Sequence, residues 1–254
     1  MTMSNLDLTE ILMYLFVIFF VGLILYLRRE DRREGYPLEE DTTGRLEPIA
    51  VGAFYAEPKT FRLHNGTEVK APSGQRDTRE LALKRTAVWP GAPYEPTGDP
   101  LADGVGPASY AMRADVPDEL HHGGPKIVPL AKAAGISILK GETDFRGGTV
   151  GGADRMVAGT VSEVWVDQAE SLIRYFEVDQ GEGGRRSILV PMMMAVIDRG
   201  QKRVRVDSAA ADQFAGAPVL KSPDQITLLE EDKIQGYFGG GYLYAWPKRK
   251  EPLA

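Results

Sequence analysis

The chain has 254 residues, with 30 Lys and Arg against 36 Asp and Glu, and it contains no Cys. This length suffices for one large domain or two small ones. The lack of cysteine excludes a disulfide scaffold, a Cys-ligated zinc or iron–sulfur site and a thiol nucleophile. The net charge of −6 argues against nucleic acid as a partner, because nucleic-acid binding depends on basic contacts to phosphates.

An uncharged apolar stretch, ILMYLFVIFFVGLILYL, occupies residues 11–27. As a helix with about 1.5 Å rise per residue it would span about 25 Å, at the short end of what crosses a bilayer. Residues 1–10 carry Asp7 and Glu10, whereas four arginines lie within residues 28–33. The positive-inside rule therefore puts residues 1–10 outside and the rest of the chain in the cytoplasm.

A cleaved signal peptide is the alternative for this stretch. Such a peptide has its positive charge before the apolar run and a small-residue cleavage site after it. Here the charge order is reversed, and the sequence RREDRREGYP after the stretch offers no such site. We therefore predict a single retained transmembrane helix over residues 11–27.

Residues 28–130 are rich in Pro and Gly and form an extended segment in this interpretation. The Asn65-Gly66 pair predicts a hairpin between residues 60–63 and 67–70, and residues 79–88 suit either a short helix or an extended piece. Aromatic residues spread through the segment argue against disorder. We expect it to lie on a surface beside the membrane, that of a partner protein or, alternatively, that of its own C-terminal domain.

Residues 131–254 have the pattern of a compact, mainly-β domain. Val161, Glu163 and Trp165 alternate with residues of the opposite face in the first of several short runs rich in β-branched and aromatic residues. A GEGG turn at residues 181–184 separates two of them. Their spacing favours a small β barrel or sandwich. The predicted strands cover residues 157–166, 172–178, 187–190, 192–197 and 204–206.

A closing helix is predicted over about residues 228–244. Thr227 and Glu230 have the spacing of a capping box, and the helix must end before Pro247. Four glycines within residues 236–241 weaken the helix by up to about 1 kcal/mol each relative to Ala. A loop is therefore the alternative, whereas a helix with a glycine-rich face suits a place where another element approaches closely.

The motifs of common enzymes do not occur. The sequence has neither G-x-S-x-G nor a P-loop. Its histidines are His64, His121 and His122, and two adjacent histidines lack the i, i+4 spacing of a helical zinc site. We expect no catalytic residue, no cofactor-binding residue and no metal site in this chain.

Two polar clusters remain. Residues 115–124, DVPDELHHGG, crowd Asp118, Glu119, His121 and His122 into a loop. A solvated surface loop is the simpler interpretation. The functional alternative is a patch that collects protons, because imidazoles titrate near neutral pH and carboxylates can exchange protons with them.

The second cluster is Asp167, Glu170 and Arg174, around a turn between two predicted strands. Turn carboxylates next to an arginine are usually structural or solvated. Buried beside a membrane-embedded redox site, the same three residues would instead form a proton relay.

The whole chain resembles the H subunit of the photosynthetic reaction centre of purple bacteria, a PRC-barrel family. The likeness includes the N-terminal span and four long segments in the same order. These are Arg33–Glu39 (REGYPLE), Pro96–Tyr110 (PTGDPLADGVGPASY), Ala158–Val178 (AGTVSEVWVDQAESLIRYFEV) and Ser222–Lys250 (SPDQITLLEEDKIQGYFGGGYLYAWPKRK).

The resemblance implies an N-terminal transmembrane helix and a cytoplasmic PRC-barrel domain, with a periplasmic N-terminus, in the intracytoplasmic photosynthetic membrane of a bacterium. It implies the L and M subunits as partners, capped on their cytoplasmic side. The chain would shield the quinone sites and conduct protons to the secondary quinone QB. Bacteriochlorophyll, bacteriopheophytin, quinones and non-haem iron would be held by L and M, and none by this chain. Membrane lipids, a cytochrome subunit and a light-harvesting antenna are further candidate partners.

The family's acidic relay near QB falls on Asp167 and Glu170, with its arginine on Arg174. The histidines at which the family takes up protons lie in the loop of residues 115–124. His122 matches one of them, and the second falls on a glycine here. A purely structural clamp, or an anchored β-barrel module with a ligand of its own, are the competing interpretations.

Overall fold

The computed structural model describes residues 7–46, 55–181 and 187–246. Contacts divide the chain into two units: Met1–Asp77 with Ala87–Ala92, and Thr78–Thr86 with Pro93–Ala254. We describe each unit by itself. Several predicted features lie partly outside the described residues, including the outer segment at residues 1–6, the GEGG turn at residues 182–184 and the C-terminal domain at residues 247–254.

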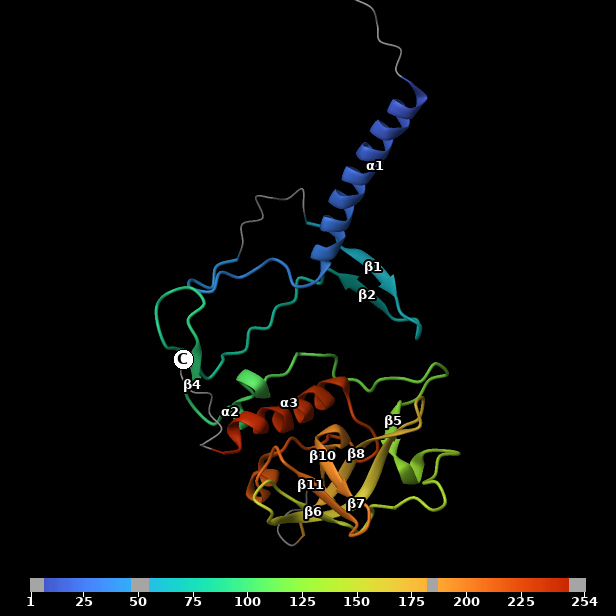
Figure 1. Cartoon of the computed structure of the whole chain (residues 1–254), viewed down its shortest axis with the longest axis vertical. Coiled ribbons are helices and arrows are strands. Elements are labelled where there is room, and N and C mark those ends of the chain that lie inside the picture. The colour runs from blue at the N-terminus through green and yellow to red at the C-terminus, as the bar shows by residue number, and fades with distance from the viewer. Residues whose placement is uncertain (1–6, 47–54, 182–186, 247–254) are drawn as a thin grey trace, which may run out of the picture. The chain divides into compact units, whose positions relative to one another are not determined.

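The first unit begins with the helix α1, Leu8–Glu30, followed by the 3₁₀ turn η1, Asp31–Arg33 (Figure 1). The prediction of a helix over residues 11–27 is confirmed, and the helix is longer at both ends. Leu8–Arg33 is the one described helix long and apolar enough to cross a membrane. Among the described residues, nothing buries a side chain of α1, so its apolar surface needs lipid or a partner to cover it.

The predicted hairpin is also confirmed, as β1 (Lys59–Arg62) and β2 (Glu68–Ala71), which pair antiparallel. Arg33, at the end of η1, holds it to the helix. Its guanidinium contacts the Glu30 carboxylate at 2.8 Å and donates to the carbonyl oxygen of Ala71 at 3.0 Å. Lys59 of β1 also contacts the Glu30 carboxylate, at 2.9 Å, so an arginine and a lysine tie the C-terminal end of α1 to the hairpin.

The second unit begins with β3 (Leu83–Arg85) and β4 (Tyr94–Pro96), so residues 79–88 contain a strand and no helix. The short helix α2 (Pro100–Asp103) and the 3₁₀ turn η3 (Gly106–Ala108) follow and pack on the C-terminal helix. Contacts thus place residues 93–130 in the same unit as the main sheet, whereas the sequence predicts a boundary between residues 130 and 131.

The main sheet of the second unit has seven strands in the order β10-β11-β6-β7-β8-β9, with β5 also paired to β7. Neighbours are antiparallel except β11 and β6. The mainly-β domain is confirmed. The strands are β5 (Ile127–Pro129), β6 (Thr149–Gly151), β7 (Val157–Asp167), β8 (Leu172–Asp179), β9 (Ile188–Pro191), β10 (Ala195–Asp198) and β11 (Arg203–Val206).

Two details of the predicted strands are wrong. The start of the expected strand 192–197 is the 3₁₀ turn η5, Met192–Met194. The expected alternation of Val161, Glu163 and Trp165 fails because the β7–β8 register shifts between Val161 and Glu163. A bulge of this kind moves the following residues to the other face, so buried Val164 follows buried Val161 by three residues, with exposed Ser162 and half-buried Glu163 between them.

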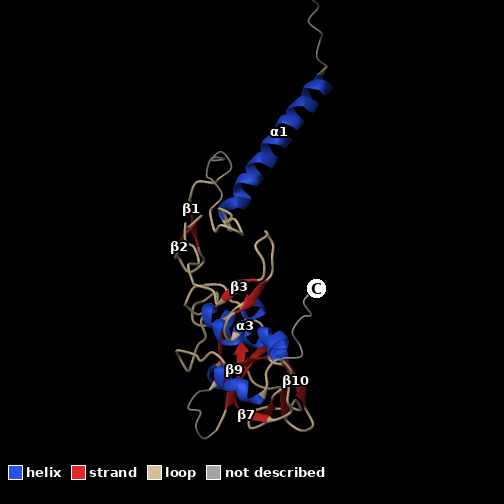
Figure 2. Ribbon diagram, turned by 90° about the vertical axis from the view of Figure 1, so that its left-hand side faces the viewer, coloured by secondary structure: helices blue, strands red, loops and turns tan. Residues whose placement is uncertain are grey.

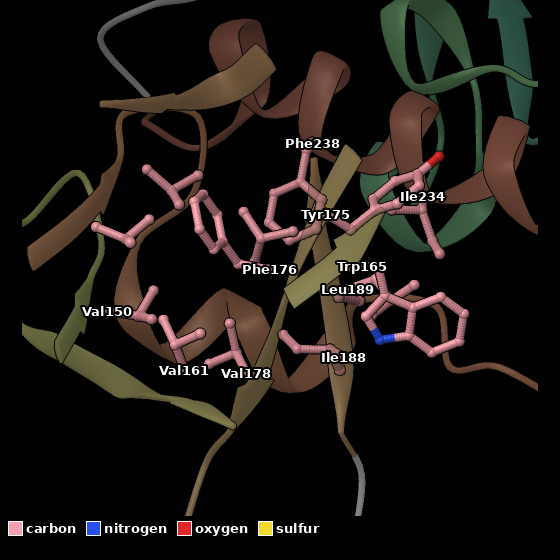
Figure 3. Packing of buried hydrophobic residues seen from close by; sticks show 14 of the residues in the cluster. Val150, Val161, Trp165, Tyr175, Phe176, Val178, Ile188, Leu189, Ile234 and Phe238 are labelled. Carbon is pink, nitrogen blue, oxygen red and sulfur yellow. The ribbon is translucent and has the colours of Figure 1, made fainter. Parts of the chain in front are cut away.

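The core lies between the sheet and the helix α3, Leu228–Tyr244, which contacts β9 (Figure 2). Ile234 and Phe238 project from α3 toward Phe176 and Tyr175 of β8 (Figure 3), and all four are buried. The predicted capping box is present: Thr227 Oγ1 accepts the Glu230 N–H at 3.1 Å, and the Glu230 carboxylate accepts the Thr227 N–H at 2.9 Å.

The glycines of α3 form a close-packed face, so the loop alternative is wrong. A Cβ atom on Gly241 would collide with the carbonyl oxygen of Ser208, and one on Gly240 with the methyl group of Ala108. At Gly239 the nearest atom, Met194 Cε, would lie 3.6 Å away, an ordinary contact. Glycine at these positions therefore allows α3 to approach the neighbouring backbone.

We expect Gly241→Ala to lower the free energy of unfolding by about 1–3 kcal/mol, because the added methyl group has no space. Gly239→Ala is the matched control, and it should raise stability by up to about 1 kcal/mol through helix propensity. Denaturant unfolding of the purified chain in detergent, followed by tryptophan fluorescence, measures both. Equal effects of the two substitutions would contradict the packing argument.

Candidate functional site

The turn between β7 and β8 is organised by Asp167, the last residue of β7. This carboxylate is fully buried, with an exposed fraction of 0%. Its Oδ1 accepts the backbone N–H groups of Ala169 at 2.9 Å and Glu170 at 3.1 Å, the local pattern by which an aspartate stabilises a turn. Ser171 completes the turn in the left-handed region, with φ 55°.

Arg174, on β8, bridges the two carboxylates of this turn. Its Nη2 lies 3.2 Å from Asp167 Oδ2 and 3.0 Å from Glu170 Oε2. The Glu170 side chain is 48% exposed and that of Arg174 is 35% exposed. The structure therefore brings together the three residues of the second predicted cluster, as one buried anion, one solvent-facing carboxylate and the cation between them.

Lys126 joins this cluster to the loop before β5. Its Nζ lies 3.4 Å from Asp167 Oδ2, 4.0 Å from Glu170 Oε1 and 3.7 Å from Asp118 Oδ2. The antiparallel pairing of β5 with β7 puts Lys126 there, because Ile127 lies opposite Asp167. Sequence reasoning missed Lys126, since a pairing between segments forty residues apart leaves no local pattern.

The buried Asp167 remains easily ionised. Burial raises the pKa of its carboxyl. Two backbone N–H groups, of Glu170 and Ala169, and two cations, Arg174 and Lys126, together lower it by a larger amount, so the pKa lies below its ordinary value. Asp167 is therefore an anion throughout the neutral range. In this state its carboxylate contacts both cations, Arg174 and Lys126.

The histidine loop is a tight turn at the edge of this site. Glu119 pairs with Pro125 in an isolated bridge, and the Leu120 N–H donates to the Gly124 carbonyl at 2.9 Å. His121 and His122 are exposed at its tip, with their rings 5.0 Å apart.

Of the predicted loop residues, Asp118 lies at the base and contacts Lys126, and Glu119 is exposed beside it. Within the described part of the chain, no hydrogen bond or ion pair joins the two imidazoles to Asp167 or Glu170. The structure therefore connects the loop to the turn cluster through Asp118 and Lys126, and not through the histidines.

An open cleft of about 750 Å³ adjoins the cluster. Asp118, Lys126, Asp167 and Arg174 line it on one side, and η5 contributes apolar methionines. Further lining residues are Arg113, Tyr175, Leu228, Glu231 and Gln235. Tyr175 donates its hydroxyl proton to Glu231 Oε2 at 3.1 Å, and Gln235 donates to the Tyr175 oxygen at 3.4 Å. The cleft thus adds a further acidic group, Glu231 on α3, that sequence reasoning missed.

Glu231 and Tyr175 both hold their protons more firmly than usual. Burial, together with the charge of Asp118, raises the pKa of Glu231 more than Tyr175, Arg113 and Arg174 lower it. Burial and the charge of Glu231 raise the pKa of Tyr175. Only the capping pair Thr227–Glu230 marks this region in the sequence, so Glu231 looked like an ordinary polar residue of the first helical turn.

The chemistry available here is proton exchange and charge stabilisation. Asp167, with a lowered pKa, and Glu231, with a raised pKa, line the same cleft. Carboxyl groups with pKa values shifted in opposite directions are typical of proton-transfer sites. The described residues contain no group of three or more His, Asp or Glu that could hold a metal ion.

We expect Asp167→Asn to lower the free energy of unfolding at pH 7 by about 1–3 kcal/mol, because the amide leaves Arg174 and Lys126 without their buried anion. The loss should shrink below about pH 4, since protonation of Asp167 removes the same charge from the wild type. Asp118→Asn, at a more exposed carboxylate, is the control and should change stability by less than about 1 kcal/mol. Denaturant unfolding as a function of pH measures all three proteins.

Glu231→Gln should have the opposite pH dependence. A raised pKa means that the folded state favours the protonated carboxyl, so this stabilisation is present below about pH 4 and is lost as pH rises through the raised pKa. The glutamine variant lacks that loss and should gain stability relative to the wild type between about pH 4 and pH 8. A constant difference across that range, in the same unfolding experiment, would contradict the raised pKa.

Comparison with protein families gives two matches. Residues 1–132, more than half of the chain, match the photosynthetic reaction centre H-chain N-terminal region, and residues 142–213 match the PRC-barrel domain. The second match covers the strands from β6 to β11 and confirms the expected barrel-type domain. The first match ends close to the predicted domain boundary at residue 130. The chain therefore belongs to the family of photosynthetic reaction centre H chains, and through that family it is a membrane-anchored subunit of a larger complex.

Proposed function

We propose that this chain caps the L and M subunits of a photosynthetic reaction centre on the cytoplasmic side, shields their quinone sites and carries protons toward the secondary quinone QB. The observation that supports this most is the network of Asp118, Lys126, Asp167, Glu170 and Arg174 at a cleft that also holds Glu231. In this proposal the chain is no enzyme by itself and binds no pigment; bacteriochlorophyll, bacteriopheophytin, quinones and non-haem iron belong to L and M.

A proton route is needed because quinone reduction to quinol takes up two protons with two electrons. Negative charge in a low-dielectric pocket is costly unless protons or fixed cations compensate it. The route must therefore pass through a domain that keeps bulk water out. A cleft lined by titratable side chains and fixed cations meets both demands.

The charge state of each residue determines its role in this proposal. Asp167 stays ionised and fixes Arg174 and Lys126, whose positive charges offset negative charge at the neighbouring carboxylates. Glu170 faces solvent and exchanges protons with water. Glu231, protonated more readily than usual, is a proton store that also lines the cleft.

The loop histidines are the proposed site of uptake from the cytoplasm. His121 and His122 are exposed, and neutral imidazoles titrate near physiological pH. Glu119 and Asp118 continue from that loop toward Lys126. Protons would pass from the exposed loop to the cleft by water between these groups, since the described contacts contain no continuous chain of side chains.

The anchor sets the orientation in this proposal. Arginines 28, 29, 32 and 33 follow the apolar part of α1 and favour the cytoplasmic side of the intracytoplasmic photosynthetic membrane, with the N-terminus in the periplasm. The apolar surface of α1 would pack against membrane subunits and lipids. A cytochrome subunit and a light-harvesting antenna remain further candidate partners.

The test is flash kinetics on the intact complex. Glu170→Gln should slow proton-coupled transfer of the second electron by about tenfold or more, the range for losing a positioned proton-transfer group. Primary charge separation should be unchanged, because it involves no proton from this chain. Glu95→Gln, at an exposed carboxylate of β4 outside the cleft, is the matched control and should leave both steps unchanged.

The competing interpretation is a structural clamp without a proton role. If Glu170→Gln and Glu231→Gln both keep wild-type kinetics of the second electron, the proton route through this cleft is wrong. If L and M are also lost when the chain is removed, while the variants keep those kinetics, the chain is a structural clamp.

A further inference from the structure

A second cleft lies on the outer face of β10, β11 and β6, away from the residues of the proton-transfer proposal. It measures about 680 Å³. Arg203 and Arg205 of β11 face outward, because Val204 and Val206 between and beside them are fully buried. The two clefts share no lining residue among those described. We call the second one the arginine groove.

Small residues make the floor of the arginine groove. In the parallel pairing of β11 with β6, Arg203 lies opposite Thr149 and Arg205 opposite Gly151. Thr149 has a short side chain and Gly151 has none, which leaves space beside the long side chains of Arg203 and Arg205. On the other side of β11, Val196 lies opposite Arg205, and its exposed side chain lines the groove.

The rim adds charge and apolar surface together. Arg155 and Arg199 contribute two further guanidinium groups. Met156 and Val157, at the start of β7, are 63% and 68% exposed. Arginine and methionine are enriched in protein interfaces, where they combine charge with apolar contact.

Two of these four arginines form an ion pair with a carboxylate among the described residues, and two do not. Arg205 pairs with Asp207 at 2.8 Å, and Arg199 pairs with Glu142 at 3.3 Å. In the described part of the chain, no ion pair joins Arg155 or Arg203 to a carboxylate, although Asp198 lies opposite Arg203 in the β10–β11 pairing and also lines the groove. This cationic surface lies on a chain whose net charge is −6, so it is a local concentration and not a property of the whole surface.

We propose that the arginine groove binds an extended, acidic and partly apolar segment of a partner protein. Alternate residues of an extended chain lie about 6.6–6.8 Å apart. Alternate carboxylates of a bound segment therefore match the spacing of Arg203 and Arg205, and guanidinium groups hold carboxylates in bidentate pairs. The exposed Met156, Val157 and Val196 favour a peptide over a small inorganic anion, since an anion would leave that apolar surface in water.

The experiment uses the whole complex in mild detergent. The probe is a fluorescein-labelled decapeptide in which glutamate alternates with threonine before two terminal leucines, and fluorescence anisotropy measures its binding. We expect saturable binding that weakens about tenfold or more in Arg203→Glu, the loss typical of a central interface residue. Arg203→Lys keeps the charge but loses the bidentate pair, so its affinity should lie between those of the wild type and Arg203→Glu, which distinguishes lost charge from lost folding.

Arg62→Glu is the matched control, because it makes the same change of charge at an exposed position of the β1–β2 hairpin and should leave binding unchanged. Four results would overturn the proposal: no saturable binding, equal weakening by Arg62→Glu, equal binding of a peptide with lysine in place of glutamate, or displacement by inorganic phosphate at the peptide's own concentration. The last result would identify a small-anion site instead.

Discussion

A carboxylate without access to water must be compensated by fixed partners, and Asp167 is such a group. Removing its charge from water costs several kcal/mol unless hydrogen bonds and cations replace the lost hydration. Two backbone N–H groups of its own turn, Arg174 of β8 and Lys126 before β5 provide that replacement. Strand pairing brings three separate segments together at this single charge.

The second constraint is the close approach of α3. Gly240 and Gly241 allow the helix backbone to lie against η3 and the segment around Ser208. Ile234 and Phe238 then enter the core beside β8. The same helix carries Glu231 to the cleft edge, next to the hydroxyl of Tyr175. The packing of small residues on one face thus determines where a titratable residue on another face lies.

How much could be predicted from the sequence depends on the range of each interaction. The apolar stretch of α1, the Asn65-Gly66 hairpin and the Thr227–Glu230 capping box are set by neighbouring residues, and each occurs as predicted. The bulge after Val161 was missed because it depends on how two strands fit together.

The candidate site divides in the same way. Asp167, Glu170 and Arg174 lie within eight residues and could be grouped from the sequence. Lys126 and Glu231 join them through the β5–β7 pairing and the position of α3. Such contacts between distant segments have no local pattern, so the sequence predicts the centre of the cluster and misses its edges.

The pKa values of Asp167 and Glu231 are shifted in opposite directions, so a proton in the cleft favours Glu231 over Asp167. A proton that enters beside Asp167 finds a group that stays ionised, held by Arg174 and Lys126, and does not remain there. Glu231 favours the protonated state, because burial and the charge of Asp118 outweigh the effects of Tyr175, Arg113 and Arg174. Two carboxyl groups in one cleft therefore differ because Asp167 directly contacts two cations and two N–H groups, whereas the direct side-chain partner described for Glu231 is the Tyr175 hydroxyl. If the chain carries protons, this difference in partners, and not the number of acidic residues, decides where a proton rests.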